Sequence, residues 1–136
     1  MELNIYLSFK GQCEAAFNFY AKVLGGSITM KFTHKDSPMA AETAPEWLDK
    51  IMHMRMEIGQ SVLMGADMPE GHQVTPQGFN ASLQIKDPAE AERVFAGLAE
   101  NGTIHMPIAE TFWAQRFGML VDQFGIPWMI NCEKSM

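Results

Sequence analysis

The chain has 136 residues, 47% of them hydrophobic and 19% charged, which is typical of one globular domain with its own core. Its net charge of -6 argues against general nucleic-acid binding, because that function needs a surface rich in lysine and arginine. No apolar run approaches the roughly 18 residues of a membrane span, and the N-terminus lacks the features of a signal peptide. We therefore expect a cytoplasmic protein that binds neither nucleic acids nor membranes.

The first half of the chain predicts a strand, a helix and three further strands. The helix runs from about Gln12 to Leu24, because Ala16, Phe19, Tyr20 and Val23 recur at helical spacing. Gly25-Gly26 follows it and is typical of a helix C-cap. The expected strands are Leu3–Phe9, Ser27–Thr33, Ile51–Ile58 and Ser61–Ala66. Residues 33–50 form an insertion, with a possible short helix at Pro45–Lys50.

The second half predicts the same order of elements. Asp87 and Pro88 open a helix as its N-cap and first residue, and Asn101-Gly102 closes it. Pro107 interrupts the strand after this helix, which favours a place at a sheet edge. The expected strands are Asn80–Ile85, Thr103–Ile108, Arg116–Asp122 and Ile126–Cys132. Cys13 and Cys132 lack metal-like spacing, so we expect two free thiols.

An internal repeat explains this shared order. Tyr6–Met30 aligns without gaps with Ser82–Met106, and eight of the 25 positions are identical. We infer a duplication into two βαβββ modules, residues 1–66 and 78–132, joined by a linker at residues 67–77 within a single domain of residues 1–136. The predicted fold is α+β, with a curved mixed sheet enclosing a cavity and the helices outside.

Two motifs give the chain a family resemblance. The repeat, with "FYAKVLGG" after the first helix and "FGMLVDQFGIPWMIN" at the end, resembles the vicinal-oxygen-chelate superfamily. This superfamily includes glyoxalase I, bleomycin-resistance proteins and extradiol dioxygenases. "YLSFKGQCEAAFNFY" and "TFWAQRFGMLVDQFGIPWMIN" are similar to its PhnB-like branch. The resemblance implies paired βαβββ modules, a homodimer, and ligand pockets near module or subunit interfaces.

The resemblance also identifies four positions where the superfamily holds a divalent metal. They fall at Ile5 or Tyr6 and Asn80 or Ala81 on the first strands, and at Met64 and Met129 on the last strands. None is His, Asp or Glu, and a thioether is a poor ligand for a hard divalent cation. We therefore predict no tightly bound metal and no glyoxalase activity. No glycine-rich loop follows a strand to hold a nucleotide cofactor, so we predict no cofactor.

The candidate ligand-binding residues are His53, Tyr6, Met64, Met129, Trp113 and Arg116. His53 shares one strand face with Arg55 and Glu57, although these three residues also fit an ordinary solvated face. Met64 and Met129 fit a deformable pocket wall, or ordinary core packing. Arg116 fits a clamp for an anionic or oxygen-rich ligand with Trp113 as a flat wall, or a surface arginine beside an aromatic anchor.

Three functions remain open at this point. The first, which we favour, is a metal-free small-molecule-binding protein of the sequestering or resistance type, with an unknown ligand. The second is an enzyme of the lyase or dioxygenase type with displaced metal ligands, or a metal-free enzyme that uses His53, Arg116 or Tyr6. The third is a dimeric module that binds another protein. Whether the chain is an enzyme is left open, with the balance against it.

Overall fold

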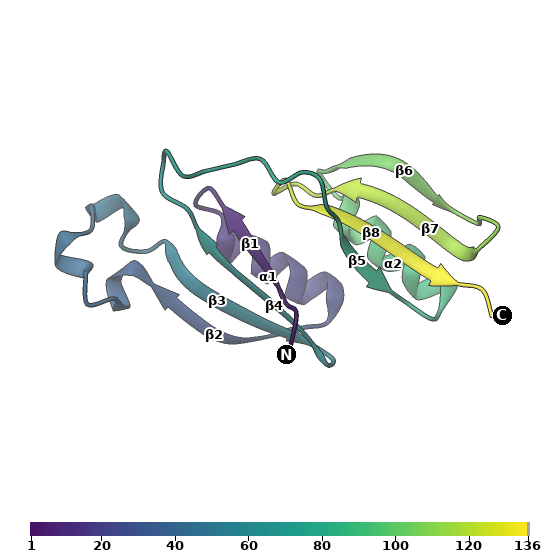
Figure 1. The fold of residues 1–136 in the computed structure, drawn as a ribbon, viewed down its shortest axis with the longest axis horizontal. Coiled ribbons are helices and arrows are strands. Elements are labelled where there is room, and N and C mark those ends of the chain that lie inside the picture. The colour runs from purple at the N-terminus through teal and green to yellow at the C-terminus, as the bar shows by residue number, and fades with distance from the viewer. Residues whose placement is uncertain (136) are drawn as a thin grey trace. The chain divides into compact units, whose positions relative to one another are not determined.

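The structure is a computed structural model that describes residues 1–135. The chain divides into two compact units, Met1–Val74 and a second that begins at Thr75. Each unit is one βαβββ module with a four-stranded mixed sheet, so the predicted α+β duplication is confirmed (Figure 1). Enclosure of a shared cavity by both modules stays a prediction, as do the single domain and its module boundaries.

The first unit places its earliest and latest strands side by side. Its elements are β1 (Ile5–Phe9), α1 (Cys13–Leu24), β2 (Ser27–Thr33), β3 (Ile51–Ile58) and β4 (Ser61–Asp67). The strand order is β1-β4-β3-β2, in which β1 and β4 are parallel and the other pairs are antiparallel. The insertion forms three short 3₁₀ helices, η1 (His34–Asp36), η2 (Ala40–Glu42) and η3 (Pro45–Trp47).

The second unit repeats this topology without the insertion. Its elements are β5 (Ala81–Gln84), α2 (Pro88–Ala99), β6 (Thr103–Ala109), β7 (Ala114–Val121) and β8 (Pro127–Glu133). The strand order is β5-β8-β7-β6, with β5 and β8 parallel. Pro107 lies in β6, an edge strand whose pairing with β7 shifts register around it, as expected for a residue without an N–H donor. No helix in residues 1–135 has the length and apolar character needed to span a membrane.

One face of each sheet is covered by the helix of its own unit. In Figure 1, α1 lies behind the first sheet and α2 behind the second. The buried residues of α1 are Cys13, Ala16, Phe17, Tyr20 and Val23, and those of α2 are Ala91, Val94, Phe95 and Leu98. The expected stripe of α1 was wrong at one place, because Phe17 is buried and Phe19 is half-buried.

The buried carboxylate of Asp67 ties three parts of the first unit together. Its Oδ1 accepts hydrogen bonds from the backbone N–H groups of Gly11 and Cys13, both at 2.9 Å. Its Oδ2 accepts one from Ile51 N–H at 2.8 Å. Gln12, the N-cap residue of α1, makes no side-chain capping bond. Asp67, at the end of β4, therefore caps the helix from a distant part of the chain and fixes the start of β3.

Candidate functional site

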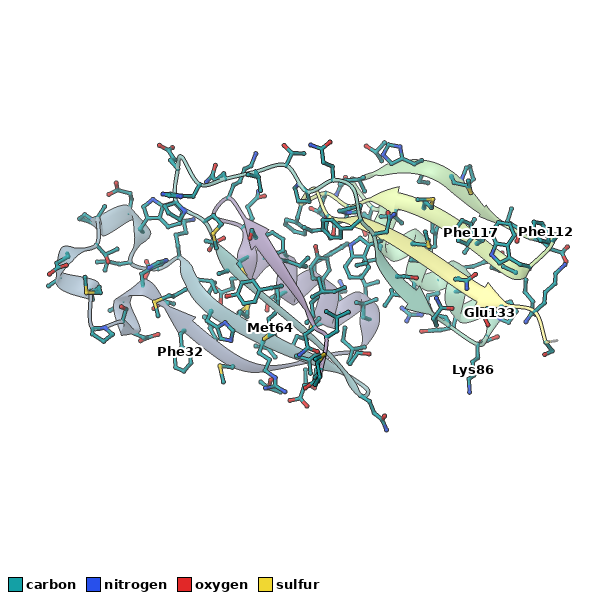
Figure 2. All side chains as sticks on the ribbon, in the orientation of Figure 1. Phe32, Met64, Lys86, Phe112, Phe117 and Glu133 are labelled. Carbon is teal, nitrogen blue, oxygen red and sulfur yellow. The ribbon has the colours of Figure 1, made fainter. Side chains whose placement is uncertain are left out.

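The face of each sheet opposite its helix, called its open face here, carries most of the candidate ligand-binding residues. The strand register defines the first open face, because residues paired across neighbouring strands point the same way. Tyr6 pairs with Met64, and Met64 pairs with Arg55. His53 pairs with Phe32 on β2. Figure 2 labels Met64 and Phe32 on this sheet. The first open face comprises Tyr6, Met30, Phe32, His53, Arg55 and Met64.

A hydrogen bond joins Tyr6 and His53 on this face. Tyr6 Oη lies 3.1 Å from His53 Nδ1, and the two rings stack with their centroids 5.7 Å apart. Desolvation by burial raises the pKa of the Tyr6 phenol, and the thiol of Cys13 raises it further. The phenol is therefore protonated at neutral pH and can donate to Nδ1 of a neutral imidazole. That bond would fix the tautomer and leave Nε2–H as a donor.

Arg55 is the cation of the first open face. It lies between two thioethers, because it pairs with Met64 on β4 and with Met30 on β2. Its Nε is buried and has no hydrogen-bond partner among residues 1–135. A guanidinium stays charged at every physiological pH, so this N–H is a strong donor without an acceptor.

The second open face has different chemistry. Ser82 pairs with Met129, Gln84 with Asn131, and Phe117 with Asn131 from the other side. Asn131 Nδ2 donates to Gln84 Oε1 at 2.8 Å, while Asn131 Oδ1 is buried without a partner in the described chain. The residues of this face are Ser82, Gln84, Phe117, Met119, Met129 and Asn131.

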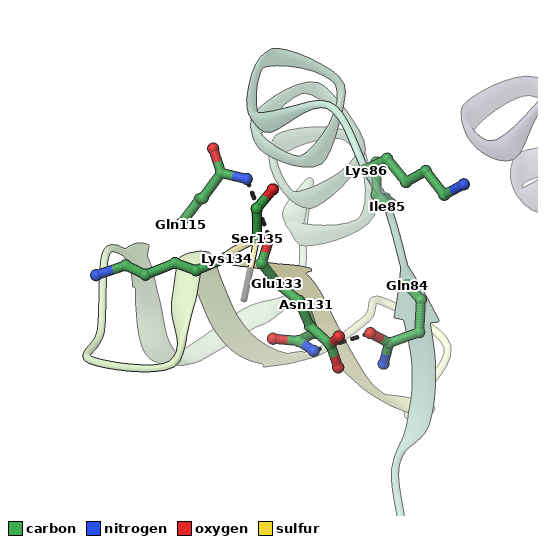
Figure 3. A pocket seen from close by; sticks show the side chains of 8 residues that line it. All are labelled: Gln84, Ile85, Lys86, Gln115, Asn131, Glu133, Lys134 and Ser135. Atoms are coloured by element: carbon green, nitrogen blue, oxygen red, sulfur yellow. Dashed lines mark hydrogen bonds between the residues drawn. The ribbon is translucent and has the colours of Figure 1, made fainter.

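A hollow of about 480 Å³ lies at one end of this second face. Figure 3 shows Asn131 and Gln84 joined in its wall, with the side chain of Gln115 bonded to the backbone oxygen of Glu133. The residues that line it are Gln84, Ile85, Lys86, Gln115, Asn131, Glu133, Lys134 and Ser135. Seven of these eight residues are polar, so the hollow offers several hydrogen-bonding groups to a ligand.

Trp113 belongs to an aromatic cluster beside the second open face. Its ring lies 5.2 Å from that of Phe117 and 4.9 Å from that of Phe112, in edge-on contacts. Figure 2 labels Phe112 and Phe117 near one end of β7. Trp113 is 42% exposed, so one side of the indole is free to contact a ligand.

Arg116 is not brought together with Trp113 and Met129. It lies on the same side of β7 as Gly118, whose backbone contacts Phe95 of α2. Its Nε donates to the Glu92 carboxylate of α2 at 3.0 Å, so the guanidinium sits on the helix-covered side. The sequence interpretation placed a ligand clamp here. Any role of Arg116 in binding stays a prediction.

The register also refines the four positions implied by the superfamily's metal site. Tyr6, not Ile5, faces Met64 in the first unit. In the second unit Ser82 faces Met129, so the expected position at Asn80 or Ala81 was wrong, and Ala81 is buried beside Trp128. Residues 1–135 contain no group of three or more His, Cys, Asp or Glu side chains placed to hold a metal. The absence of bound metal stays a prediction.

The fold, the duplication and the two open faces define a class of protein. A family model described as the Glyoxalase/Bleomycin resistance protein/Dioxygenase superfamily matches residues 3–130, and the chain belongs to this superfamily. Protein YjdN from Escherichia coli K12 is 36% identical, with 99% of this chain and 97% of that protein covered.

Two solved structures are similar to this chain over nearly its whole length. Protein PA1353 from Pseudomonas aeruginosa is 40% identical, has a TM-score of 0.90, and covers 99% of both chains. A PhnB protein from Bacillus cereus, described as a putative 3-demethylubiquinone-9 3-methyltransferase, is 23% identical with a TM-score of 0.80 over 97% of this chain and 99% of that one. The second likeness shows a shared fold and carries no activity to this chain.

Two polar groups of these faces escaped the sequence interpretation. Arg55 was noted only as a neighbour of His53, and Asn131 was not singled out. Strand alternation put Arg55 on the face of His53, but the lack of a carboxylate partner is visible only in three dimensions. The buried amide of Asn131 gives no sequence signal, because it lies among the apolar residues of β8.

Proposed function

We propose that the protein binds a small, largely apolar molecule on its open faces and needs no metal to do so. The observation that carries this proposal is the side-chain chemistry of those faces. Met64 and Met129 occupy the last-strand positions opposite Tyr6 and Ser82. Thioethers adapt their shape to different ligands, and large apolar side chains left partly exposed together are typical of binding surfaces.

The exposure of the first open face supports this proposal. Tyr6 and Phe32 are each 46% exposed and Met30 is 37% exposed, while the helix-side residues Leu7, Met54 and Met56 are buried. Apolar area left accessible on one sheet face gains free energy when a ligand covers it, at about 25 cal/mol per Å². The ligand would cover Met64 and lie between Tyr6 and the side chains of β2.

Native mass spectrometry of freshly purified protein is the first test, because a tightly bound ligand would appear as added mass. The second is a fluorescence titration with N-phenyl-1-naphthylamine, a neutral apolar probe. Met64→Lys should weaken its binding about tenfold or more, since a charge would be desolvated beneath the ligand. Met39→Lys is the matched control, because Met39 is exposed in the insertion. Equal loss in both variants, or no binding by the unmodified protein, would contradict the proposal.

A metal-free enzyme is the second candidate, and the hydrogen bond between Tyr6 and His53 favours it. An imidazole oriented by a phenol on a ligand-binding face has the arrangement of a general base or acid. The test is to incubate a co-purified ligand with the protein and with His53→Gln. If the unmodified protein converts the ligand and His53→Gln does not, catalysis by His53 is established. If neither protein changes the ligand, binding alone is favoured. Elemental analysis giving about one zinc, nickel, iron or manganese per chain would instead support a metal enzyme.

A homodimer in the cytoplasm is part of the proposal. The edge strands β2 and β6 carry exposed apolar side chains, including Ile28, Phe32, Ile104 and Met106, and such edges favour pairing with another chain. Both cysteines are free, which fits a reducing compartment. Sedimentation should give a species of about twice 15.2 kDa. A species of only 15.2 kDa at micromolar concentration would exclude the dimer.

A further inference from the structure

Arg55 differs from the other two arginines of the sequence in its charge partners. Arg93 pairs with Glu90, and Arg116 pairs with Glu92. No carboxylate of residues 1–135 forms an ion pair with Arg55, although the chain has 16 Asp and Glu residues. Glu57 is the nearest acidic residue along β3, two positions away on the same strand face; it is exposed and forms no ion pair with Arg55. A guanidinium without a carboxylate in so acidic a chain is the feature that needs a physical explanation.

The surroundings of Arg55 strengthen its interaction with any anion. Its Nε is buried and unpartnered, and its cross-strand neighbours Met30 and Met64 supply no opposing charge and no acceptor stronger than a thioether. In such an apolar setting, attraction between a guanidinium and an anion is screened less than in water. Because no acceptor in the described chain competes for the guanidinium, an anion that reaches its exposed end would form the stronger, charge-assisted kind of hydrogen bond.

We propose that Arg55 binds the anionic group of the ligand, which makes the ligand an amphiphilic anion with an apolar body and one carboxylate, sulfonate or phosphonate. This inference rests on the proposed function, since it concerns the same open face. A planar guanidinium can take two oxygens of such a group at once. The apolar body then lies over Met64 towards Tyr6, two strand spacings or about 10 Å away. That length fits one or two fused rings.

A pair of probes tests the charge separately from the apolar body. 8-Anilinonaphthalene-1-sulfonate carries a sulfonate, and N-phenyl-1-naphthylamine has the same ring system without it. The full-length protein is titrated with each probe, alongside Arg55→Met, Arg55→Lys and the control Arg93→Met. Arg55→Met should weaken sulfonate binding about 10- to 100-fold, as expected for a lost hydrogen bond to a charged group, and change binding of the neutral probe less than about twofold.

The other variants make the result specific. Arg93→Met should bind both probes like the unmodified protein, because Arg93 is exposed on α2. Arg55→Lys keeps the charge and should recover part of the sulfonate affinity. Far-UV circular dichroism confirms that each variant is folded. If both probes bind and Arg55→Met weakens them equally or not at all, the inference is wrong and the proposed function stands. If neither probe binds the unmodified protein, both fail.

Discussion

Removal of the Asp67 side chain tests how the first open face is held in place. Asp67→Ala deletes a carboxylate that is 3% exposed and accepts three backbone hydrogen bonds. The affected N–H groups belong to Gly11, after the strand that carries Tyr6, to Cys13 in the first turn of α1, and to Ile51, two residues before His53. Their loss loosens both strands that carry the Tyr6–His53 pair.

The expected loss of stability is large for a single substitution. A hydrogen bond to a charged group contributes about 1.5 to 3 kcal/mol, and one of the three N–H groups is only partly buried. Taking the low end of that range, Asp67→Ala should lower the free energy of unfolding by about 4 kcal/mol. A typical domain has only about 5 to 15 kcal/mol in total. Asp67→Asn keeps one oxygen acceptor and should lose about half as much.

Urea unfolding followed by far-UV circular dichroism at neutral pH measures the effect. Asp36→Ala is the matched control, because Asp36 also accepts hydrogen bonds from a backbone N–H and a hydroxyl, both of Thr33, but is exposed. Its cost should be much smaller than that of Asp67→Ala, because solvent competes for the hydrogen bonds of an exposed carboxylate. If Asp67→Ala and Asp36→Ala destabilise the protein equally, the assignment of Asp67 as a long-range cap is wrong.

Two further predictions concern buried groups. Burial raises the pKa of the Cys13 thiol far above its usual value, with Asp67 and Glu14 adding to the shift, so the native state holds this proton more tightly than the unfolded state. The free energy of unfolding, measured with urea, should therefore fall as pH rises above about 9. The fall should be less steep in Cys13→Ala, which lacks the thiol. Equal slopes of the free energy against pH in the two proteins would contradict this prediction. Gly118→Ala would bring a Cβ within 2.6 Å of the Phe95 ring and 3.0 Å of the Ile108 backbone, so it should cost about 1 to 3 kcal/mol. A cost below about 0.5 kcal/mol, the size of an ordinary surface substitution, would refute the close packing.

Most of the fold could be predicted from local sequence because its signals are periodic or stereochemical. Strand alternation located β2 and β3, and Asp87 with Pro88 marked the start of α2, where Asp87 accepts a hydrogen bond from Ala89 N–H. The start of α1 carries no such signal, because its cap comes from Asp67, more than 50 residues away. A contact of that range leaves no local pattern.

The candidate site was harder to predict, because the face of a residue depends on strand register. In β7 the helix-side residues Gly118 and Leu120 alternate with Phe117 and Met119, and both sets are compatible with burial. The sequence therefore did not reveal that Arg116 points towards α2. In β3, by contrast, polar residues alternate cleanly with methionines, so the common face of His53 and Arg55 was predictable. The lack of a charge partner for Arg55 could not be predicted in this way.

Comparison of the two modules separates what the fold requires from what the open faces are free to vary. On the helix side each module places a glycine against a helix phenylalanine, although at different repeat positions: Gly65 of β4 lies against Phe17, and Gly118 of β7 lies against Phe95. Close packing of helix on sheet leaves no room for a side chain at either glycine. On the open side, Tyr6 is replaced by Ser82 at the repeat position, while methionine remains at both last-strand positions.

The first open face thus carries a cation and an oriented imidazole, and the second carries a pair of amides and an indole. Each face, taken by itself, therefore suits a different chemical group, the first an anion and the second a hydrogen-bonding group. Arg55→Met should weaken the binding of 8-anilinonaphthalene-1-sulfonate, whereas Asn131→Leu should leave it unchanged within about twofold. An equal loss of affinity in the two variants would mean that the two faces do not differ in the chemistry they offer to a ligand.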